Sequence, residues 1–527
     1  MANEYRRLPI GVQSFAKLRT ENFIYVDKTR FIYDLVHKSA QYFLSRPRRF
    51  GKSLFLSTLK AYWEGKKELF SGLAIAELEK DNPVAWQSCP VFYIDFNKES
   101  YQRDGALEDV LDEHLRGWEE LYGGRQGETL GGRFRSLLQR AYEKTGRGCV
   151  VLVDEYDKSL LDVLGNNELE EHNKEVFKGF FSTLKSYDQY LQFVFITGVT
   201  KFSKVSIFSD LNQLNDISLS RDYADICGIT EEELLACFRP EIEAMAKIQQ
   251  MTFDECLAEL QEKYDGYHFH PQGAGVYNPF SLLKALYDKD FGSYWFSTGT
   301  PVFLVNKLKS LHYDSSKLGN GQAFVKDTLL MDYRVDDPNP LPLLYQTGYL
   351  TIRSFDRRKS GYTLCFPNQE VRYGFLDSLL PAYVPKMSNL AGTDIFSLDE
   401  AAEQGDLEGM RDILAAIFAG ISYTDERSPF EHYFQTVIYL VFTLLGRFLQ
   451  CELHTSRGRI DCVMETEKYI YLFEFKRDVA AEAALRQIEE KGYAERFAAD
   501  KRTLYKIGVA FDSEKRELSD WKVGLVG

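Results

Sequence analysis

Hydrophobic residues in the first two hundred positions come in short continuous runs, separated by longer amphipathic stretches. The runs predict four strands, at Gln41–Ser45, Cys89–Phe96, Cys149–Glu155 and Leu191–Gly198. Strands that are apolar at nearly every position fit a sheet covered on both faces, and the amphipathic stretches between them fit the covering helices. This order of elements predicts an α/β domain with a parallel sheet.

The pattern changes to helical spacing near Gly228–Phe238, where Thr230 is placed to cap a helix with an acidic first turn. Short helices and small strands are expected to follow, as a helical, winged-helix-like lid. Polar and small residues at Ser388–Asp406 then predict a boundary. We therefore expect three modules, at residues 1–230, 231–385 and 386–527.

The last module contains a predicted hairpin with a polar turn at Glu465–Lys468, followed by a strand at Tyr469–Lys476. The period of two in this strand places Glu474 and Lys476 on one face together with aliphatic residues, while aromatic residues line the other face. Because both faces are apolar, the strand is predicted to be central in its sheet. A Glu and a Lys on such a strand are costly unless they are paired or bind a metal.

The composition fits a folded protein of several modules. The chain has 527 residues, of which 44% are hydrophobic, and its formal net charge is −14. This charge opposes nucleic-acid binding over the whole surface, so any such binding needs a local basic groove. The densest apolar segment, Val437–Leu449, is shorter than the roughly 18 residues of a membrane span. We therefore expect a cytoplasmic protein without a membrane partner.

Cysteine and histidine spacing gives no sign of a zinc site. The eight cysteines are scattered without a C-x-x-C pair, which favours reduced, mostly buried thiols over a zinc ribbon or a disulfide framework. His268 and His270 lie two positions apart, but no cysteine or further histidine lies nearby in the sequence. A loop pair or a core histidine is the preferred interpretation.

A candidate nucleotide site lies in the segment "RPRRFGKS", where Gly51, Lys52 and Ser53 come between an apolar strand and a helix. At such a helix start, a phosphate meets unpaired N–H groups and the positive end of the helix dipole. In the pattern G-x-x-x-x-G-K-[ST], Lys52 would bind the β- and γ-phosphates and Ser53 would bind Mg²⁺. The first glycine of the pattern falls on Arg46.

Other residues complete this predicted site. Arg48 and Arg49 either add positive charge to it or point outward, and both alternatives fit the sequence. Asp154 and Glu155 lie where an apolar strand ends. Asp154 would join the Mg²⁺ shell, and Glu155 would orient and deprotonate the attacking water. A further strand ends in the polar segment Thr197–Lys201, and we expect Thr197 to contact the nucleotide.

Four segments together resemble the AAA-ATPase-like family of bacterial and archaeal proteins. They are "YVDKTRFIYDLV", "RPRRFGKSL", "VVLVDEYD" and "FITGVTKFSKVSIFSDLNQL". The resemblance covers roughly the first 230 residues and continues less specifically to about Phe375. It implies an ATP-binding P-loop NTPase with a catalytic acid after the metal-binding Asp, in which Arg46 is a regular feature of the phosphate loop.

The hairpin of the last module predicts a second metal site. Asp461 can lie beside Glu474 across the hairpin, which gives two hard oxygen ligands suited to Mg²⁺. Lys476 would position or activate a water and offset negative charge at phosphorus. Glu431 lies on an amphipathic helix from which it can point at the same metal, and Gln487 lies on the helix that follows the hairpin.

The segment from about Ser428 to Phe511 resembles the PD-(D/E)XK nuclease family that is found fused to AAA-ATPase-like domains. The matching positions are Glu431, Asp461, Glu474, Lys476 and Gln487. Ile460 stands where many members of the superfamily have proline. The resemblance implies a restriction-endonuclease-like α/β fold and Mg²⁺-dependent catalysis.

The leading hypothesis is an ATP-dependent or ATP-regulated nuclease that uses ATP and Mg²⁺, with a role in defence or mobile-element biology. Nucleic acid is the expected partner of the last module, with DNA ahead of RNA. An arginine supplied by a neighbouring subunit would make the protein a homo-oligomer. The alternative is a nucleotide-switched protein that binds nucleic acid or signals without cutting.

Overall fold

The structure of the protein is a computed structural model. It describes residues 6–125, 127–201, 214–295, 304–305, 307–308, 311, 313, 318, 323–331, 339–383, 391–419, 437, 440–441, 449–455, 458–512, 514–515 and 517–526. The chain divides into two compact units. The first consists of Met1–Trp295 and Phe324–Glu370, and the second of Phe296–Ala323 and Val371–Gly527. The expected division into three modules stays a prediction.

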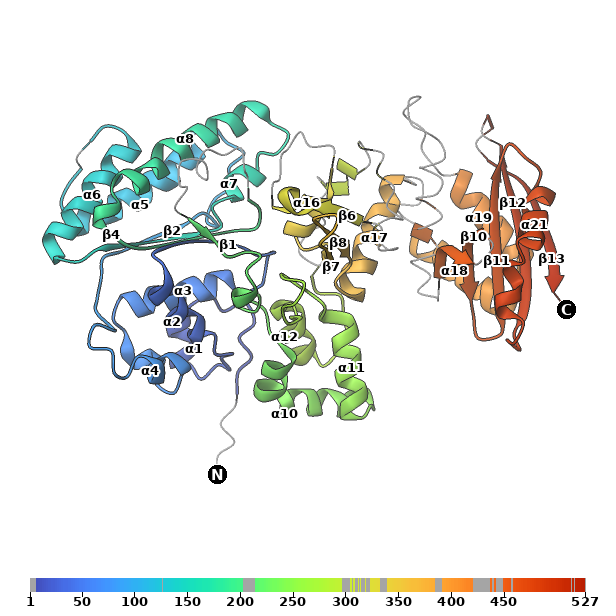
Figure 1. The fold of residues 1–527 in the computed structure, drawn as a ribbon, viewed down its shortest axis with the longest axis horizontal. Coiled ribbons are helices and arrows are strands. Elements are labelled where there is room, and N and C mark those ends of the chain that lie inside the picture. The colour runs from blue at the N-terminus through green and yellow to red at the C-terminus, as the bar shows by residue number, and fades with distance from the viewer. Residues whose placement is uncertain are drawn as a thin grey trace. The chain divides into compact units, whose positions relative to one another are not determined.

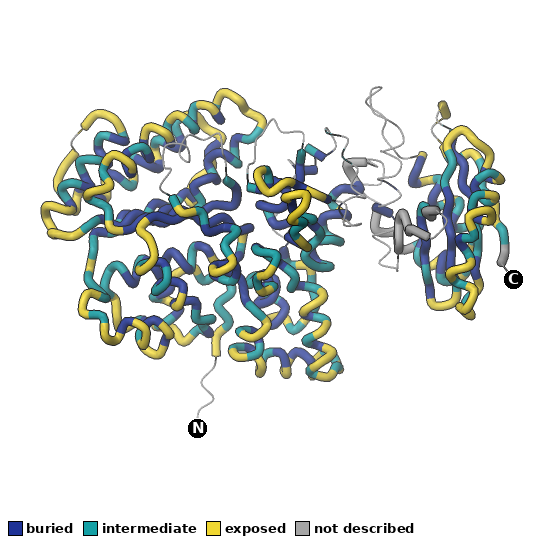
Figure 2. Tube along the Cα trace, in the orientation of Figure 1, coloured by how far each residue is buried: buried dark blue, intermediate teal, exposed yellow. Residues whose placement is uncertain are grey.

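A five-stranded parallel sheet forms the centre of the first unit, in the order β2-β3-β4-β1-β5 (Figure 1). The strands are β1 (Gln41–Ser45), β2 (Val91–Asp95), β3 (Cys149–Asp154), β4 (Leu191–Gly198) and β5 (Asn215–Asp216). The predicted parallel sheet is confirmed, and β1 and β3 are buried along their whole length (Figure 2). The register pairs Leu44 with Thr197 and Asp95 with Asp154, so the carboxyl ends of four strands meet at one edge.

Helices cover both faces of this sheet (Figure 1). One face carries α1 (Phe15–Thr20), α2 (Thr29–Lys38), α3 (Lys52–Trp63) and α4 (Ala74–Leu78). The other carries α5 (Ala106–Tyr122), α6 (Leu130–Thr145) and α8 (Asn167–Ser186), while the short α7 (Lys158–Leu161) follows β3. The expectation that amphipathic stretches wrap the sheet is therefore confirmed.

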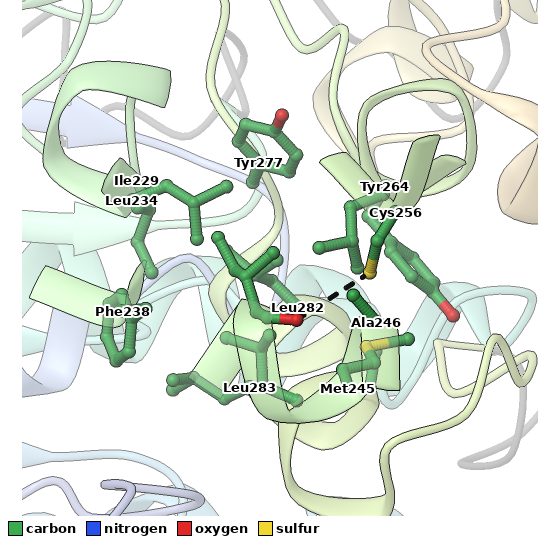
Figure 3. Close-up of a cluster of buried hydrophobic side chains, with 14 of the residues drawn as sticks. Ile229, Leu234, Phe238, Met245, Ala246, Cys256, Tyr264, Tyr277, Leu282 and Leu283 are labelled. Atoms are coloured by element: carbon green, nitrogen blue, oxygen red, sulfur yellow. Dashed lines mark hydrogen bonds between the residues drawn. The ribbon is translucent and has the colours of Figure 1, made fainter. Parts of the chain in front are cut away.

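A helical part follows the sheet in the first unit. It contains α10 (Glu231–Gln249), α11 (Phe253–Tyr264) and α12 (Pro279–Asp288). Thr230 caps α10 through a capping box with Glu233, as the sequence predicts. The apolar faces of the three helices bury a common cluster, which includes Leu234, Phe238 and Leu282 (Figure 3).

A three-stranded sheet lies next in the chain, in the order β6-β8-β7. Its strands are β6 (Ala323–Lys326), β7 (Thr351–Asp356) and β8 (Gly361–Cys365), and it is accompanied by α15 (Asp327–Leu330) and α16 (Leu341–Gln346). α17 (Gln369–Tyr383) begins in the first unit and continues into the second. The winged-helix-like interpretation of this region stays a prediction.

The second unit contains a mixed sheet in the order β13-β12-β11-β10-β9. Its strands are β9 (Leu449–Thr455), β10 (Gly458–Glu465), β11 (Tyr469–Arg477), β12 (Thr503–Asp512) and β13 (Glu517–Val526). β11 is parallel to β12, and the other pairs are antiparallel. The predicted hairpin and the central place of its second strand are confirmed.

Helices pack on both faces of the mixed sheet. α21 (Ala481–Glu490) buries Ile488 against Ile470 and Leu472 of β11. On the other face, Tyr471 donates its hydroxyl to the Ala402 carbonyl of α18 (Ala391–Gln404) at 2.6 Å. α19 (Leu407–Ala419) packs Phe418 against Phe511 on this face as well. Both faces of β11 are thus apolar because helices pack on both sides of the sheet.

Two general expectations concern the chain as a whole. Of the helices that the structure describes, none has both the length and the apolar character to cross a bilayer. The cytoplasmic location stays a prediction. Seven of the eight cysteines, all except Cys451, are thiols and not part of a disulfide, and four of these seven are buried.

Candidate active sites

The phosphate loop starts where β1 ends and leads into α3. Gly51 caps this helix with φ +93°, a left-handed conformation that costs other residues about 1 kcal/mol or more. Lys52 is only 3% exposed. Its Nζ donates to the carbonyls of Arg46 (2.9 Å) and Pro47 (3.0 Å) and lies 3.9 Å from Glu155 Oε1. The loop therefore folds around the ammonium group, at the helix end that favours phosphate.

Asp154 lies at the end of β3, beside Thr197 from β4. Thr197 Oγ1 donates to Asp154 Oδ1 (2.9 Å), Tyr93 donates its hydroxyl to Oδ2 (3.3 Å), and the Ser53 hydroxyl also bonds this carboxylate. Burial raises the pKa of Asp154, while the bonds from Ser53 and Thr197 act in the opposite direction. A buried carboxylate beside a hydroxyl fits Mg²⁺, because the ion would offset the cost of burying the anion.

Glu155 has a left-handed backbone conformation, with φ +48°. Such a conformation costs a non-glycine residue about 1–2 kcal/mol, and this kind of strain is concentrated at functional sites. The Glu155 N–H donates to Thr197 Oγ1 (3.3 Å), and the turn places the carboxylate near Lys52. The structure thus brings together the predicted residues Gly51, Lys52, Ser53, Asp154, Glu155 and Thr197.

Asp157 also belongs to this site, and it is absent from the sequence-based predictions. Its carboxylate is fully buried and accepts from the N–H groups of Val199 (3.0 Å) and Thr200 (2.6 Å) and from Thr200 Oγ1 (2.7 Å). These bonds fix the turn that follows Thr197. The signal for it was the last acid of "VDEYD", three residues after Asp154.

Arg46 is a structural residue beneath the phosphate loop. Its side chain is 1% exposed and donates to the carbonyls of Ser218 (2.8 Å) and Tyr223 (2.9 Å). Its guanidinium lies 4.0 Å from the ring centroid of Phe269. Arg46 therefore joins the loop to two later segments of the first unit, which a glycine at this position could not do.

Replacing Arg46 by glycine would restore the usual phosphate-loop pattern, yet we expect it to destabilise the protein. The change removes the Arg46 hydrogen bonds to the buried carbonyls of Ser218 and Tyr223 and opens a cavity, which together cost about 3–5 kcal/mol. The melting temperature in differential scanning calorimetry should fall by about 5 °C or more. Arg48→Gly is the matched control, because Arg48 is exposed. Equal melting temperatures for Arg46→Gly and the wild type would contradict this role.

The other two arginines of the loop take different places. Arg48 is exposed. Arg49 has φ +69°, and its guanidinium lies 3.8 Å from the ring centroid of Phe280 in α12. This distance allows a cation–π contact between the loop and the helical part. The nucleotide contacts expected of Arg48 and Arg49 stay predictions.

The second site lies on the β10–β11 hairpin. Cys462 of β10 pairs with Phe473 of β11. Asp461 and Glu474 are the next residues away from the hairpin turn, so they occupy adjoining positions on the two strands. Asp461 Oδ2 accepts the N–H of Phe475 (2.9 Å). The expected approach of Asp461 and Glu474 across the hairpin thus appears in the structure.

The side chains of Lys476 and Gln487 connect Glu474 to α21. Lys476 Nζ lies 3.1 Å from Glu474 Oε1 and donates to Gln487 Oε1 (2.7 Å), while the Gln487 amide donates to Glu474. Packing of α21 on β11 positions Gln487 for both bonds. The described residues contain no group of three or more His, Cys, Asp or Glu side chains that could hold a metal. Glu431, the remaining predicted ligand, lies outside the described residues.

Glu474 is a buried carboxyl whose ionised form is disfavoured by its surroundings. It is 1% exposed, and burial together with the nearby Asp461 raises its pKa to about 7, although Lys476 acts in the opposite direction. Within the described part of the chain, its Oε2 is buried without a hydrogen-bond partner. A free carboxylate oxygen beside a second carboxylate fits a divalent cation.

The raised pKa of Glu474 predicts that Asp461→Asn changes the stability of the protein in a pH-dependent way, in protein kept free of metal with EDTA. A raised Glu474 pKa means that its contribution to folding is present at low pH and is lost as the pH rises through about 7. Removing the Asp461 charge should therefore raise the free energy of unfolding by roughly 1 kcal/mol at pH 8.5 and leave it unchanged at pH 5.

Calorimetric melting of the two proteins at both pH values measures this effect. Glu467→Gln is the control, because it removes one charge from an exposed position in the same hairpin. A gain of equal size at pH 5 and pH 8.5 would show that Asp461 does not act through Glu474.

The chain matches two protein-family models and is similar to one known protein over almost its full length. Residues 9–208 match the family model described as predicted AAA-ATPase, and residues 429–521 match that of the PD-(D/E)XK nuclease superfamily. The chain is 35% identical over 536 residues to an uncharacterized protein in the vnfD 5′ region of Azotobacter chroococcum mcd 1, with 99% of each chain covered.

Two solved Aeropyrum pernix structures are distantly similar. The ORC1 protein in complex with DNA has 11% identity and a TM-score of 0.24, over 66% of this chain and 91% of that one. The ORC2 protein (ADPNP–ADP complexes) has 10% identity and a TM-score of 0.23, over 72% and 97%. Scores this low do not bear on function.

Proposed function

We propose an ATP-regulated, Mg²⁺-dependent nuclease, on the premise that this chain belongs to the AAA-ATPase-like family and carries a C-terminal domain of the PD-(D/E)XK nuclease superfamily. The observation that carries the proposal is the buried Glu474 carboxylate beside Asp461, Lys476 and Gln487, whose Oε2 has no hydrogen-bond partner among the described residues. A hairpin with only a structural role would have no need of an unpaired buried carboxylate oxygen.

At the first site, the chain's own groups divide the work of ATP hydrolysis. Lys52 binds the β- and γ-phosphates, and Ser53 and Asp154 would hold Mg²⁺. Glu155 accepts the proton of the attacking water at its carboxylate. Thr197 orients Asp154 through its 2.9 Å hydrogen bond.

At the second site, Asp461 and Glu474 would hold Mg²⁺, with Glu431 as the proposed third ligand. The ion, when bound, supplies positive charge at the scissile phosphate and lowers the pKa of a water. Lys476 orients the attacking water and stabilises the negative charge that develops at phosphorus. Gln487 holds Lys476 and Glu474 in place through its two hydrogen bonds.

The partner of the second site is nucleic acid, with DNA ahead of RNA. The net charge of −14 requires that a local basic surface bind it. A homo-oligomer, a cytoplasmic location and a role in defence or mobile-element biology belong to the same proposal.

The proposal is tested by incubating the purified protein with circular and linear DNA and with RNA, in Mg²⁺ or Mn²⁺, with and without ATP. We expect cleavage of at least one substrate, and we expect EDTA to stop it. An absence of cleavage on every substrate in both metals would rule out nuclease function.

One observation favours the alternative of a nucleotide-switched binding protein. Lys52 is already bonded to two loop carbonyls, and Pro47 cannot donate an N–H to phosphate. Both features suit slow turnover. A steady-state ATPase assay separates the alternatives, because hydrolysis that depends on Lys52 and proceeds at about 1 s⁻¹ or faster excludes a slow switch.

A further inference from the structure

The chain leaves the first unit at two points, after Trp295 and after Glu370. The structure holds these two points together. Glu370 is 2% exposed, and its Oε1 accepts the N–H groups of Trp295 (2.8 Å) and Tyr294 (2.5 Å). Any movement of one exit point is therefore shared by the other.

The phosphate loop is connected to the exit point at Trp295 through Gly348, which follows α16. A Cβ added at Gly348 would lie 2.6 Å from Pro47 Cβ and 3.5 Å from Trp295 Cζ2, so the backbone here is in close contact with both rings. Trp295 also packs against Tyr349, with ring centroids 4.9 Å apart. We call Pro47, Gly348, Trp295 and Glu370 the exit contact.

A second connection runs parallel to the exit contact. Tyr267 donates its hydroxyl to the Gly348 carbonyl (3.1 Å), and its ring lies edge-on to Phe50 of the phosphate loop, 4.8 Å between centroids. Both Tyr267 and Phe50 are buried. Gly348 is thus held from two sides by neighbours of the phosphate-binding residues.

We propose that the exit contact transmits nucleotide occupancy of the phosphate loop to the two points where the chain passes to the nuclease-like unit. This regulation rests on the proposed function of the two sites. Pro47 is the bridging residue, because its carbonyl accepts from Lys52 Nζ while its ring contacts Gly348. A phosphate at Lys52 competes for the same ammonium hydrogens, and the rigid proline ring moves with its backbone.

Glu370 and Trp295 are therefore positioning residues, distant in sequence from both sets of predicted catalytic groups. Packed interfaces respond to small shifts by repacking as a whole. Loss of the Lys52 hydrogen bond at the Pro47 carbonyl can therefore change the packing around Trp295. A nucleotide-dependent signal at the exit points themselves measures this coupling directly.

Hydrogen–deuterium exchange of the full chain, with and without a nonhydrolysable ATP analogue and Mg²⁺, makes that measurement. We expect nucleotide to slow exchange at least about fivefold in peptides covering residues 46–53 and in those covering residues 294–295 and 369–370. Glu370→Ala should keep the first effect and lose the second. Glu370→Gln keeps an acceptor oxygen and should retain both.

Two further variants keep the test sharp if Glu370→Ala folds poorly. Trp295→Phe should reduce the effect at the exit points. Gly348→Ala should change the nucleotide effect at the exit points, whereas Gly146→Ala should not. Gly146 also has positive φ, but an added Cβ there would have no atom of a non-adjacent described residue within 4 Å.

The proposal is overturned if the wild type shows no nucleotide effect at the exit points. It is also overturned if the folded Glu370→Ala or Trp295→Phe variant shows the full effect. Since exchange requires no cleavage, a protein that shows this coupling but cuts no nucleic acid would contradict the proposed nuclease function alone.

Discussion

Lys476→Ala is expected to lower the rate of nucleic-acid cleavage by about a thousandfold while ATP hydrolysis stays at the wild-type rate. The physical reason is that Lys476 places a positive charge beside Glu474, with Nζ 3.1 Å from its Oε1. Without it, the carboxylate lacks its counter-charge and the developing charge at phosphorus lacks its stabilising partner. The measurement is the single-turnover rate on a labelled substrate in saturating Mg²⁺.

Lys501→Ala is the matched control for this variant, because Lys501 is exposed in the same unit. Lys476→Arg is informative as well. It retains the charge, but its planar guanidinium does not fit the tight group around Gln487, so we expect a loss of at least about tenfold. Cleavage by Lys476→Ala at the wild-type rate would remove Lys476 from the catalytic group.

Glu155→Gln should lower ATP turnover by about a hundredfold to a thousandfold and leave ATP affinity within about threefold of the wild type. The amide has the shape of the carboxylate but cannot accept the proton of water. Hydrolysis is measured by phosphate release, and affinity by titration with a fluorescent ATP analogue. Lys52→Ala is the contrasting variant, because it should lose binding as well as turnover.

Unchanged phosphate release by Glu155→Gln would show that another group takes the proton. Asp157 is not expected to be that group, since its carboxylate is fully buried and already accepts bonds from the turn after β4. Asp157→Asn should therefore affect ATP turnover only indirectly, by changing the position of Thr197.

Local pattern was sufficient for much of the fold. The four apolar runs became parallel strands because continuous apolar sequence is stable only where helices cover both faces, and the aligned register then placed Asp154 beside Thr197. The period of two in β11 likewise placed Glu474 and Lys476 on the face that α21 covers.

Long-range contacts were beyond the reach of sequence patterns. Arg46 interacts with residues more than 170 positions away, and Pro47 contacts Gly348, so neither partner could be read from local spacing. The left-handed backbone of Glu155 was also unpredictable, because glutamate, unlike Gly, Asn or Asp, gives no signal for positive φ. The spacing of "VDEYD" did contain Asp157, whose role depends on the tertiary turn that it holds.

The central claim is that nucleotide at the first site controls cleavage at the second. The most direct test compares the Mg²⁺-dependent cleavage rates of the wild type and Lys52→Ala, each with and without ATP. We predict that ATP changes the wild-type rate at least about fivefold and leaves the rate of Lys52→Ala unchanged. A wild-type rate that is the same with and without ATP would contradict the claim.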